Sequence, residues 1–221
     1  NSVDFETGTP TPNLKNVAYI QPEISAPEPV PPPVAQSSVE SSVEFSPQII
    51  EASLKNILIH KLQIDSMEGV GGTADDWVQL YNPNDADVSL SGWSIQKFSS
   101  SESCSLEKGY YKKNFASEAT IPAHGFFLIA NTQSAEIILS AAAMTVSWSL
   151  SDNNTVYLVK SKEKITDGSD LDIVDKVGFG EHACFSESSP APTPPEAKVI
   201  TRKYLGSDTD SNANDFEIFA E

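Results

Sequence analysis

From about position 51 onward, apolar residues come in short runs that are rich in Val, Ile, Leu, Phe, Trp and Tyr. Gly, Pro, Asn, Asp and Ser separate each run from the next. Short runs of β-branched and aromatic residues between turn formers indicate strands rather than helices. We therefore expect strands over residues 56–65, 76–81, 93–98, 125–130, 155–160, 173–179, 199–204 and 215–219.

Several of these strands carry apolar residues on both faces. In the segment 155–160, Val156 and Leu158 lie on one face, and Tyr157 and Val159 lie on the other. A helical apolar period is sustained only over residues 134–144, which could form one short helix or an irregular excursion. About 170 residues of short strands with regular turns predict an all-β fold, an antiparallel β-sandwich.

The first fifty residues have a different composition. They hold nine of the fifteen prolines, including the run Pro31-Pro32-Pro33, together with Ser, Glu and Gln and few large apolar residues. Such a segment cannot bury enough apolar surface to offset the entropy of ordering it, and proline favours an extended chain. We predict a disordered, acidic, Pro-rich linker or stalk over residues 1–50 and a β-sandwich domain over residues 51–221. A proline-motif ligand for a partner domain is the alternative for the first segment.

The chain is strongly acidic. Its 14 Lys and Arg residues against 31 Asp and Glu residues give a net charge of −17, which excludes a general nucleic-acid binder because phosphate contacts need a basic surface. No apolar run approaches the roughly 18 residues of a membrane-spanning helix. The chain begins at Asn1 without the pattern of a signal peptide, so we expect a mature chain or an excised fragment.

Motifs for catalysis are scarce. The sequence has neither a Gly-x-Ser-x-Gly elbow nor a phosphate-binding Gly-x4-Gly-Lys loop, and the glycines of residues 69–72 indicate a flexible loop. Asp75 and Asp76 form an acidic pair at the start of a predicted strand, where we expect a solvated, turn-ending role rather than acid–base catalysis. The histidines lie in different segments without ligand-spaced neighbours, and we expect structural or solvated roles for His60, His124 and His182.

The segment 208–215 is the most metal-like. It carries side-chain oxygens at alternate positions, as at the opening of a calcium loop, and its candidate ligands are Asp208, Asp210, Asn212 and Asp215. However, Ala213 replaces the glycine and Phe219 the final glutamate of the helix-loop-helix motif. We therefore expect no metal and no cofactor, but a turn in which side chains bond backbone amides and Phe216 is buried.

Two further groups of residues have structural interpretations. Cys104 and Cys184 are 80 residues apart and belong to no Cys/His cluster, which argues against zinc and leaves either a bridge or two free thiols. We expect most of the aromatic residues in or beside the predicted strands to pack in the core: Trp77, Trp93, Phe126, Phe127, Trp148 and Phe179.

Six blocks in a fixed order carry a family resemblance: residues 57–63, 76–83, 88–95, 120–125, 174–180 and 202–216. Together they resemble the lamin-tail domain, an immunoglobulin-like sandwich found at the end of nuclear lamins and in bacterial secreted and surface proteins. The resemblance spans roughly residues 55–219. Its motif residues in this chain are Trp77, Leu90, Gly92, Trp93, Asp208, Asp210 and Phe216.

This resemblance implies a non-enzymatic binding or adhesion module, extracellular or on a bacterial cell surface, which recognises a protein or a glycan. Relatives are often joined to extracellular enzymes, so an accessory domain of a larger surface enzyme is one alternative, and a structural spacer is another. A metal-dependent hydrolase using Asp75, Asp76 and the segment 208–215 is the remaining one. An oxidising surface location also predicts a disulfide between Cys104 and Cys184.

Overall fold

The computed structural model describes residues 54–64, 75–99, 104, 109–181, 183–195 and 198–219. The predicted Pro-rich segment 1–50, the glycine loop 69–72 and His182 lie outside these residues, so the expectations about them remain predictions.

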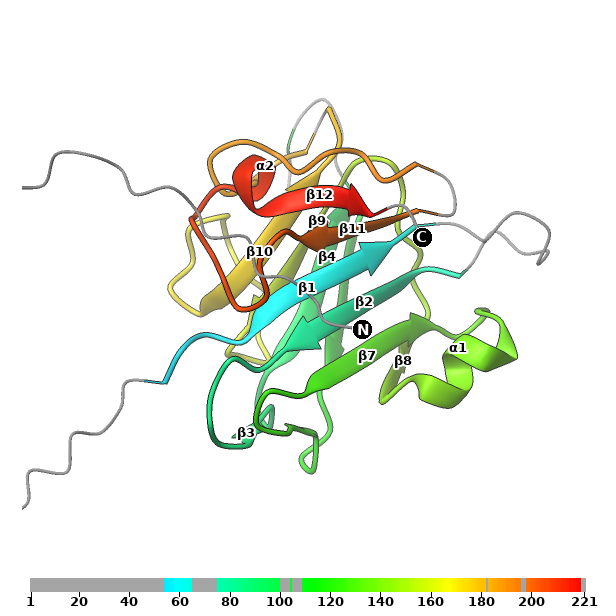
Figure 1. Cartoon of the computed structure of the whole chain (residues 1–221), viewed down its shortest axis with the longest axis vertical. Helices are drawn as coiled ribbons and strands as arrows, with labels where there is room; N and C mark the ends of the chain where they lie inside the picture. The colour runs from blue at the N-terminus through cyan, green and yellow to red at the C-terminus, as the bar shows by residue number, and fades with distance from the viewer. Residues whose placement is uncertain are drawn as a thin grey trace, which may run out of the picture. The chain divides into compact units, whose positions relative to one another are not determined.

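Two antiparallel sheets form the domain, one in front of the other (Figure 1). The six-stranded sheet has the order β12-β11-β1-β2-β7-β8, and the four-stranded sheet has the order β10-β9-β4-β5. The strands of the first sheet are β1 (Leu58–Gln63), β2 (Trp77–Tyr81), β7 (Phe126–Asn131), β8 (Met144–Val146), β11 (Val199–Arg202) and β12 (Phe216–Phe219). Those of the second are β4 (Ser94–Ser99), β5 (Tyr110–Asn114), β9 (Asn154–Val159) and β10 (Ile173–Phe179).

Four short elements complete the chain. The strands β3 (Val88–Ser89) and β6 (Thr120–Ile121) pair with each other outside the two large sheets. The helices are α1 (Glu136–Ala141), which joins β7 to β8, and α2 (Asn212–Asp215), which leads into β12. Within the described part of the chain, no helix is long and apolar enough to cross a membrane.

The main core lies between the two sheets because each contributes one apolar face. Val78 and Leu80 of β2 pack there with Val156 and Leu158 of β9, all fully buried. The opposite face of the four-stranded sheet has a smaller core, in which Tyr157 and its neighbours are covered by the segment between β9 and β10. This cover explains why β9 is apolar on both faces.

The predicted fold, an immunoglobulin-like antiparallel β-sandwich, is confirmed. Each of the eight predicted strands appears, and the segment 134–144 forms the short helix α1 and the start of β8. One pairing differs from the rest, because β8 runs parallel to β7. The hydrophobic pattern of the sequence does not predict β3, β5, β6, β8 or α2.

Candidate functional site: a buried arginine and its carboxylates

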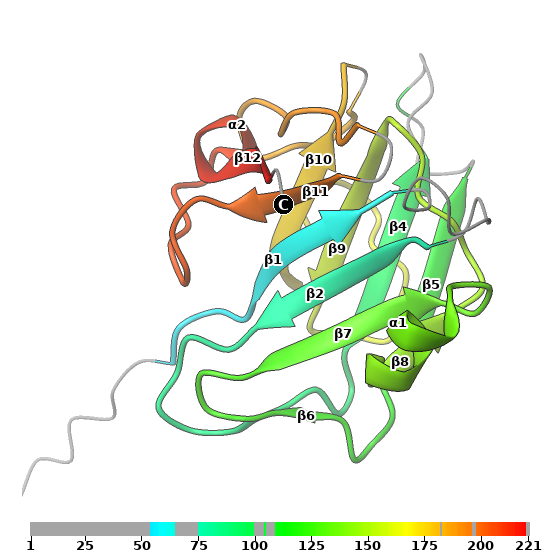
Figure 2. The ribbon, with the colours of Figure 1, turned by 45° about the vertical axis from the view of Figure 1, so that its right-hand side comes forward.

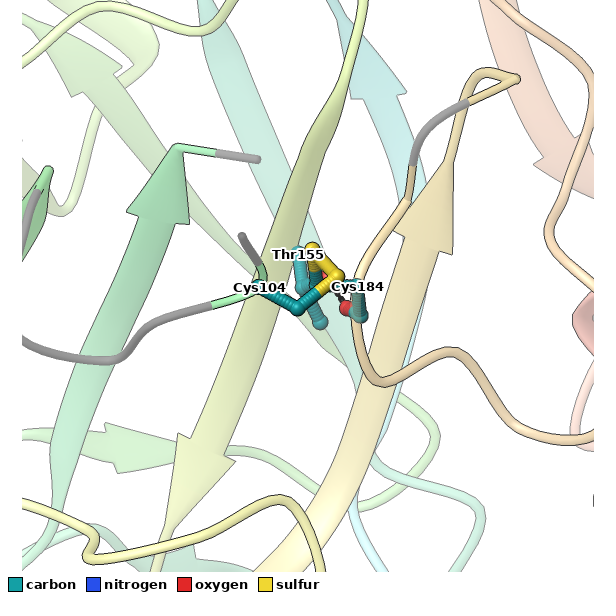
Figure 3. Close-up of a disulfide and its surroundings, with 3 residues drawn as sticks. All are labelled: Cys104, Thr155 and Cys184. Atoms are coloured by element: carbon teal, nitrogen blue, oxygen red, sulfur yellow. Dashed lines mark hydrogen bonds between the residues drawn. A yellow bond between two sulfur atoms is a disulfide. The ribbon is translucent and has the colours of Figure 1, made fainter. Parts of the chain in front are cut away.

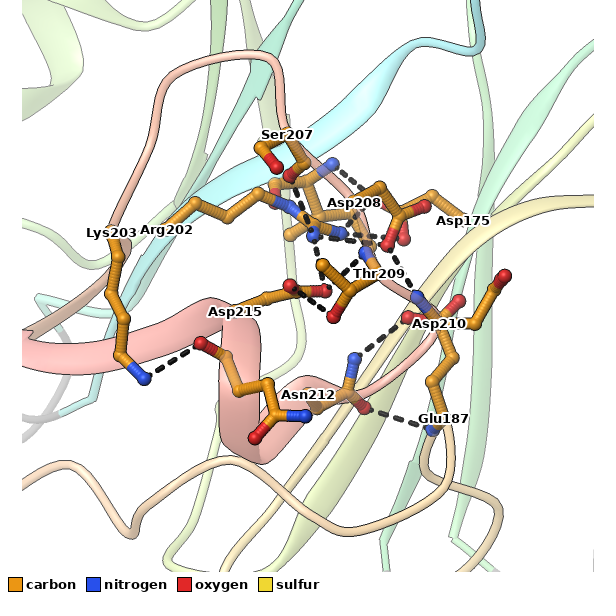
Figure 4. A network of polar contacts seen from close by, with 12 residues as sticks. Asp175, Glu187, Arg202, Lys203, Ser207, Asp208, Thr209, Asp210, Asn212 and Asp215 are labelled. Atoms are coloured by element: carbon orange, nitrogen blue, oxygen red, sulfur yellow. Dashed lines mark hydrogen bonds and ion pairs between the residues drawn. The ribbon is translucent and has the colours of Figure 1, made fainter.

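Arg202, the last residue of β11, is the centre of a buried polar network, and only 1% of its side chain is exposed. Nη2 donates to both carboxylate oxygens of Asp175 on β10, at 2.9 and 3.0 Å (Figure 4). Nη1 lies 3.1 Å from the Asp215 carboxylate and 3.2 Å from that of Asp208, and Nε donates to the carbonyl of Ile59 at 2.9 Å. The guanidinium therefore joins β1, β10, β11 and the segment 208–215.

Asp175 is the polar exception in the apolar pattern of β10. Its carboxylate also accepts a hydrogen bond from the backbone N–H of Ile59 at 2.5 Å. Burial raises the pKa of Asp175, while the adjacent Arg202 guanidinium opposes that shift. Since β1 and β10 belong to different sheets, this side chain connects the two layers of the sandwich.

The segment 208–215 forms a turn closed by its own side chains. Thr209 donates to Asp215 through its backbone N–H at 3.0 Å and through its hydroxyl at 2.7 Å, and the backbone N–H of Asp210 lies 3.3 Å from Asp208 Oδ1. Burial raises the pKa of Asp215, but the bonds from Thr209 outweigh it and leave that pKa below its usual value. Asp210 has a φ of 54°, a left-handed conformation that Asp tolerates better than most residues.

Asn212 holds this turn against β10. Its fully buried amide oxygen accepts from the backbone N–H groups of Gly178, at 2.9 Å, and Glu187, at 3.0 Å. Its amide nitrogen donates to the carbonyl of Lys176 at 3.0 Å and to the Glu187 carboxylate at 2.9 Å. Asn212 is thus a structural residue rather than a free oxygen ligand.

Three carboxylates come together beside this network. Single oxygens of Asp175, Glu187 and Asp208 all lie within 4.8 Å of one another, and they line a surface cavity of about 410 Å³. Burial and the neighbouring charges of Asp175 and Asp208 raise the pKa of Glu187 to about 8. The structure therefore brings Asp208 close to two residues that the sequence analysis did not connect with it, while Asn212 and Asp215 have other partners.

The three carboxylates are of the kind that binds hard cations, but Arg202 already supplies a positive charge beside them. Arg202 Nη2 donates to both carboxylate oxygens of Asp175, and Nη1 lies 3.2 Å from Asp208. A divalent cation held by the three carboxylates would lie beside the guanidinium, and the repulsion between the two cations opposes binding. Among the described residues, those that could hold a metal ion are Asp175, Glu187 and Asp208. That the protein binds no metal stays a prediction.

We expect calcium to leave the stability of the protein unchanged. A site that binds only the folded state adds RT ln(1 + [L]/Kd), so about 1 mM calcium on a micromolar site would add roughly 4 kcal/mol. Thermal melting curves recorded with calcium and with a chelator should coincide. An upward shift of several degrees that is absent in Asp208→Ala would show that the segment is a metal site.

The raised pKa of Glu187 makes stability depend on pH. Because its pKa of about 8 in the folded protein exceeds the ordinary value of 4.5, this group contributes stability that is fully present below pH 4.5 and is lost as the pH rises through 8. Glu187→Gln keeps an oxygen for Asn212 and removes the charge. In urea unfolding, we expect the variant and the original protein to have the same free energy of unfolding at about pH 4.5. Near pH 8.5 the variant should be more stable by about 1 to 3 kcal/mol.

Glu217→Gln, at an exposed position on β12, is the matched control and should change stability equally at both pH values. An equal effect of Glu187→Gln at both pH values would contradict the explanation.

The solvated role expected for Asp75 and Asp76 is wrong, because 4% and 2% of these residues are exposed. Asp75 accepts from the backbone N–H of Ala135 at 2.6 Å, and Asp76 accepts from that of Leu150 at 2.9 Å. Both carboxylates satisfy backbone groups of neighbouring loops. These partners, Ala135 and Leu150, belong to other segments than those that Asp208 contacts.

The histidines have different environments. His60 is buried, and the centroid of its ring lies 6.1 Å from that of Tyr81 and 5.6 Å from that of Phe126. Burial, together with the positive charges of Lys61 and Arg202, lowers the pKa of His60 to about 4. His124 is exposed and lies 2.8 Å from Asp85.

The family-motif residues also vary in burial. Leu90 and Phe216 belong to the main core, Gly92 has a φ of 85° that favours glycine, and Trp93 is half-buried against the core. Trp77 is half-buried outside that cluster. Among the other aromatic residues, Phe127, Trp148 and Phe179 are buried, whereas Phe126 is 47% exposed.

Cys104 and Cys184 form the predicted disulfide (Figure 3). Their Cα atoms are 5.3 Å apart, inside the range that a bridge requires. The Thr155 hydroxyl on β9 donates to the carbonyl of Cys184. The bridge thus links the region between β4 and β5 to the segment that follows β10.

Removing this bridge should lower stability. It closes a loop of 80 residues, and constraining a loop of that size in the unfolded chain stabilises by about 2 to 4 kcal/mol. Unfolding of the double variant Cys104→Ser/Cys184→Ser, compared with the original protein, measures the effect. Thiol titration of the denatured, unreduced protein should detect no free thiol, and two thiols per chain would contradict the pairing.

The fold is an immunoglobulin-like sandwich with a structural arginine–carboxylate network, and residues 52–180 match the model of the Lamin Tail Domain. Because that match covers more than half of the sequence, the chain belongs to the lamin tail domain family. The matched region ends before β11 and β12, which complete the six-stranded sheet.

One similar solved structure is the crystal structure of a DUF4876 family protein from Bacteroides thetaiotaomicron. The similarity has a TM-score of 0.54 at 10% sequence identity and covers 74% of this chain and 71% of that one, so it concerns the fold alone. No curated protein matches the chain.

Proposed function

We propose that this chain is a non-enzymatic binding module that works outside the bacterial cytoplasm, where it recognises a protein or glycan partner and is displayed on its Pro-rich N-terminal segment. One observation carries the proposal: four of the carboxylates that the sequence offered for hydrolysis have structural partners. Those of Asp208 and Asp215 bond Arg202, and those of Asp75 and Asp76 accept backbone hydrogen bonds. Membership of the lamin tail domain family supports a binding or accessory role.

The location is supported by the disulfide, because such bridges persist in oxidising compartments. Labelling intact cells of the source organism with a membrane-impermeant, amine-reactive biotin reagent tests it. The exposed lysines should react without lysis. Labelling only after lysis would contradict an external location.

Recognition is tested by capture of native cell-envelope components on the immobilised full chain. A partner retained by this chain, but not by its Arg202→Met variant after partial unfolding, would support a folded binding surface.

Limited proteolysis tests the predicted stalk. Residues 1–50 should be cleaved first. Rapid cleavage throughout residues 51–221, with the first segment protected, would contradict the division into stalk and domain.

A further inference from the structure

The strand β5 (Tyr110–Asn114) forms one margin of the four-stranded sheet, beyond β4 (Figure 2). Four of its five residues are exposed, and among the described strands none pairs with its outer side. An edge strand of this kind presents backbone donors and acceptors to which another extended chain can pair.

The register shows which backbone groups are free. Ser99 N–H bonds to Gly109 C=O at 3.0 Å, and Phe115 N–H bonds to Trp93 C=O at 3.0 Å, so the odd-numbered residues of β5 form the hydrogen-bonded pairs with β4. Alternation along an antiparallel ladder then points the N–H and C=O groups of the even-numbered residues away from β4. These residues are Tyr110, Lys112 and Asn114.

The edge is basic in a protein of net charge −17. Lys112 and Lys113 are exposed and, being consecutive in a strand, lie on opposite faces of the sheet. The Lys112 ammonium contacts the carbonyl of Lys162, which brings a third exposed lysine to the same margin. None of the three has an ion-pair partner in the described part of the chain.

An apolar groove continues this edge toward the other sheet. It has a volume of about 270 Å³ and lies between the end of β5 and the start of β8. Its lining includes Phe127, Ala143 and Met144, with Lys113 and Asn114 at the β5 side. This arrangement offers room for an apolar side chain next to Lys113, which has no ion-pair partner in the described part of the chain.

We propose that the outer edge of β5 binds an acidic, extended peptide segment of a partner protein by strand addition, with one apolar side chain of that segment in the groove. Main-chain hydrogen bonds to residues 110, 112 and 114 would supply affinity, and the pocket would supply specificity. Acidic side chains on the two faces of the added strand would meet Lys112 and Lys113. The inference rests on the proposed binding function and names the partner's chemistry.

Charge also explains selectivity at this edge. Lysines on an edge strand discourage pairing with neutral or basic strands, whereas an acidic strand neutralises them. A long polyanion such as a nucleic acid fits less well, because the basic area is confined to one margin of an acidic molecule.

The probe is a blocked peptide of about eight residues in which Glu-Glu and Val-Val pairs alternate, titrated into the full chain. We expect saturable binding that weakens about tenfold when salt rises from low to several-fold higher concentration. In amide hydrogen exchange, Tyr110, Lys112 and Asn114 should become protected, while Tyr111 and Lys113 change little because they already pair with β4. Protection elsewhere with none on β5 would overturn the proposal.

The double variant Lys112→Glu/Lys113→Glu should weaken binding of this probe at least about tenfold and should gain binding of the analogue with Lys in place of Glu. Such a charge-swap gain cannot come from misfolding. Lys55→Glu/Lys198→Glu makes the same change in charge at exposed lysines away from β5 and should bind the acidic probe nearly unchanged. Equal losses in the two double variants would overturn the proposal.

Heparin and a short DNA duplex are tested against the same variants. Binding of either that is tighter than that of the peptide and equally dependent on Lys112 and Lys113 would overturn the peptide in favour of a polyanion. If the envelope partner is captured equally by the Lys112→Glu/Lys113→Glu variant, the β5 edge is not the site, while the proposed binding function stands.

Discussion

Replacing Arg202 by methionine should destabilise the protein by about 3 to 5 kcal/mol, because it leaves the buried carboxylate of Asp175 without its charged partner. Removal of one member of a buried ion pair costs far more than the pair itself contributes. The loss should appear as a lower midpoint of urea unfolding without a change in slope.

Lys203→Met is the control at the next position, where the side chain is exposed and bonds carbonyls at the end of α2. It should cost less than about 1 kcal/mol. The compensated variant Arg202→Met/Asp175→Leu should recover part of the loss, since it removes both charges. An Arg202→Met protein as stable as the Lys203→Met protein would refute the structural role of the network.

Phe216→Ala should cost about 3 to 5 kcal/mol, the usual range for a fully buried aromatic residue. Only 2% of Phe216 is exposed, and its ring packs in the main core with the Arg202 guanidinium 4.8 Å from its centre. The substitution therefore opens a cavity under the turn 208–215. Chemical denaturation measures the effect.

Phe219→Ala, on the same strand but 43% exposed, should cost much less. Because Phe216 and Arg202 are in contact, their combined loss should not equal the sum of the single losses. Near-equal effects of Phe216→Ala and Phe219→Ala would contradict the packing described here.

The sequence predicted those strands whose apolar residues face the core. In β9, Val156 and Leu158 face one core and Tyr157 the other, so the alternation is visible in the sequence. The sequence of β5 gives no such signal, since Tyr111, Lys112 and Lys113 are exposed and the strand exists because it pairs with β4. Strands held by pairing rather than burial leave little trace in hydrophobic patterns.

The polar network was harder to predict because its members are distant in sequence. The only signal was Asp175, a charged residue in an otherwise apolar alternation, and its partner Arg202 is 27 residues away. The solvated role predicted for Asp75 and Asp76 was wrong for a related reason. A carboxylate at the start of a strand is usually solvated, and only the tertiary fold brings Ala135 and Leu150 to these two side chains.

The order of the six-stranded sheet also determines how the domain responds to tension. The first strand, β1, and the last, β12, both pair with β11 and are antiparallel to it, so they run in the same direction (Figure 1). A pull between the start of β1 and the end of β12 therefore loads their hydrogen bonds to β11 along the strands, in shear. All these bonds must break together rather than one after another, which makes this sheet mechanically strong for a load carried through both ends of the chain.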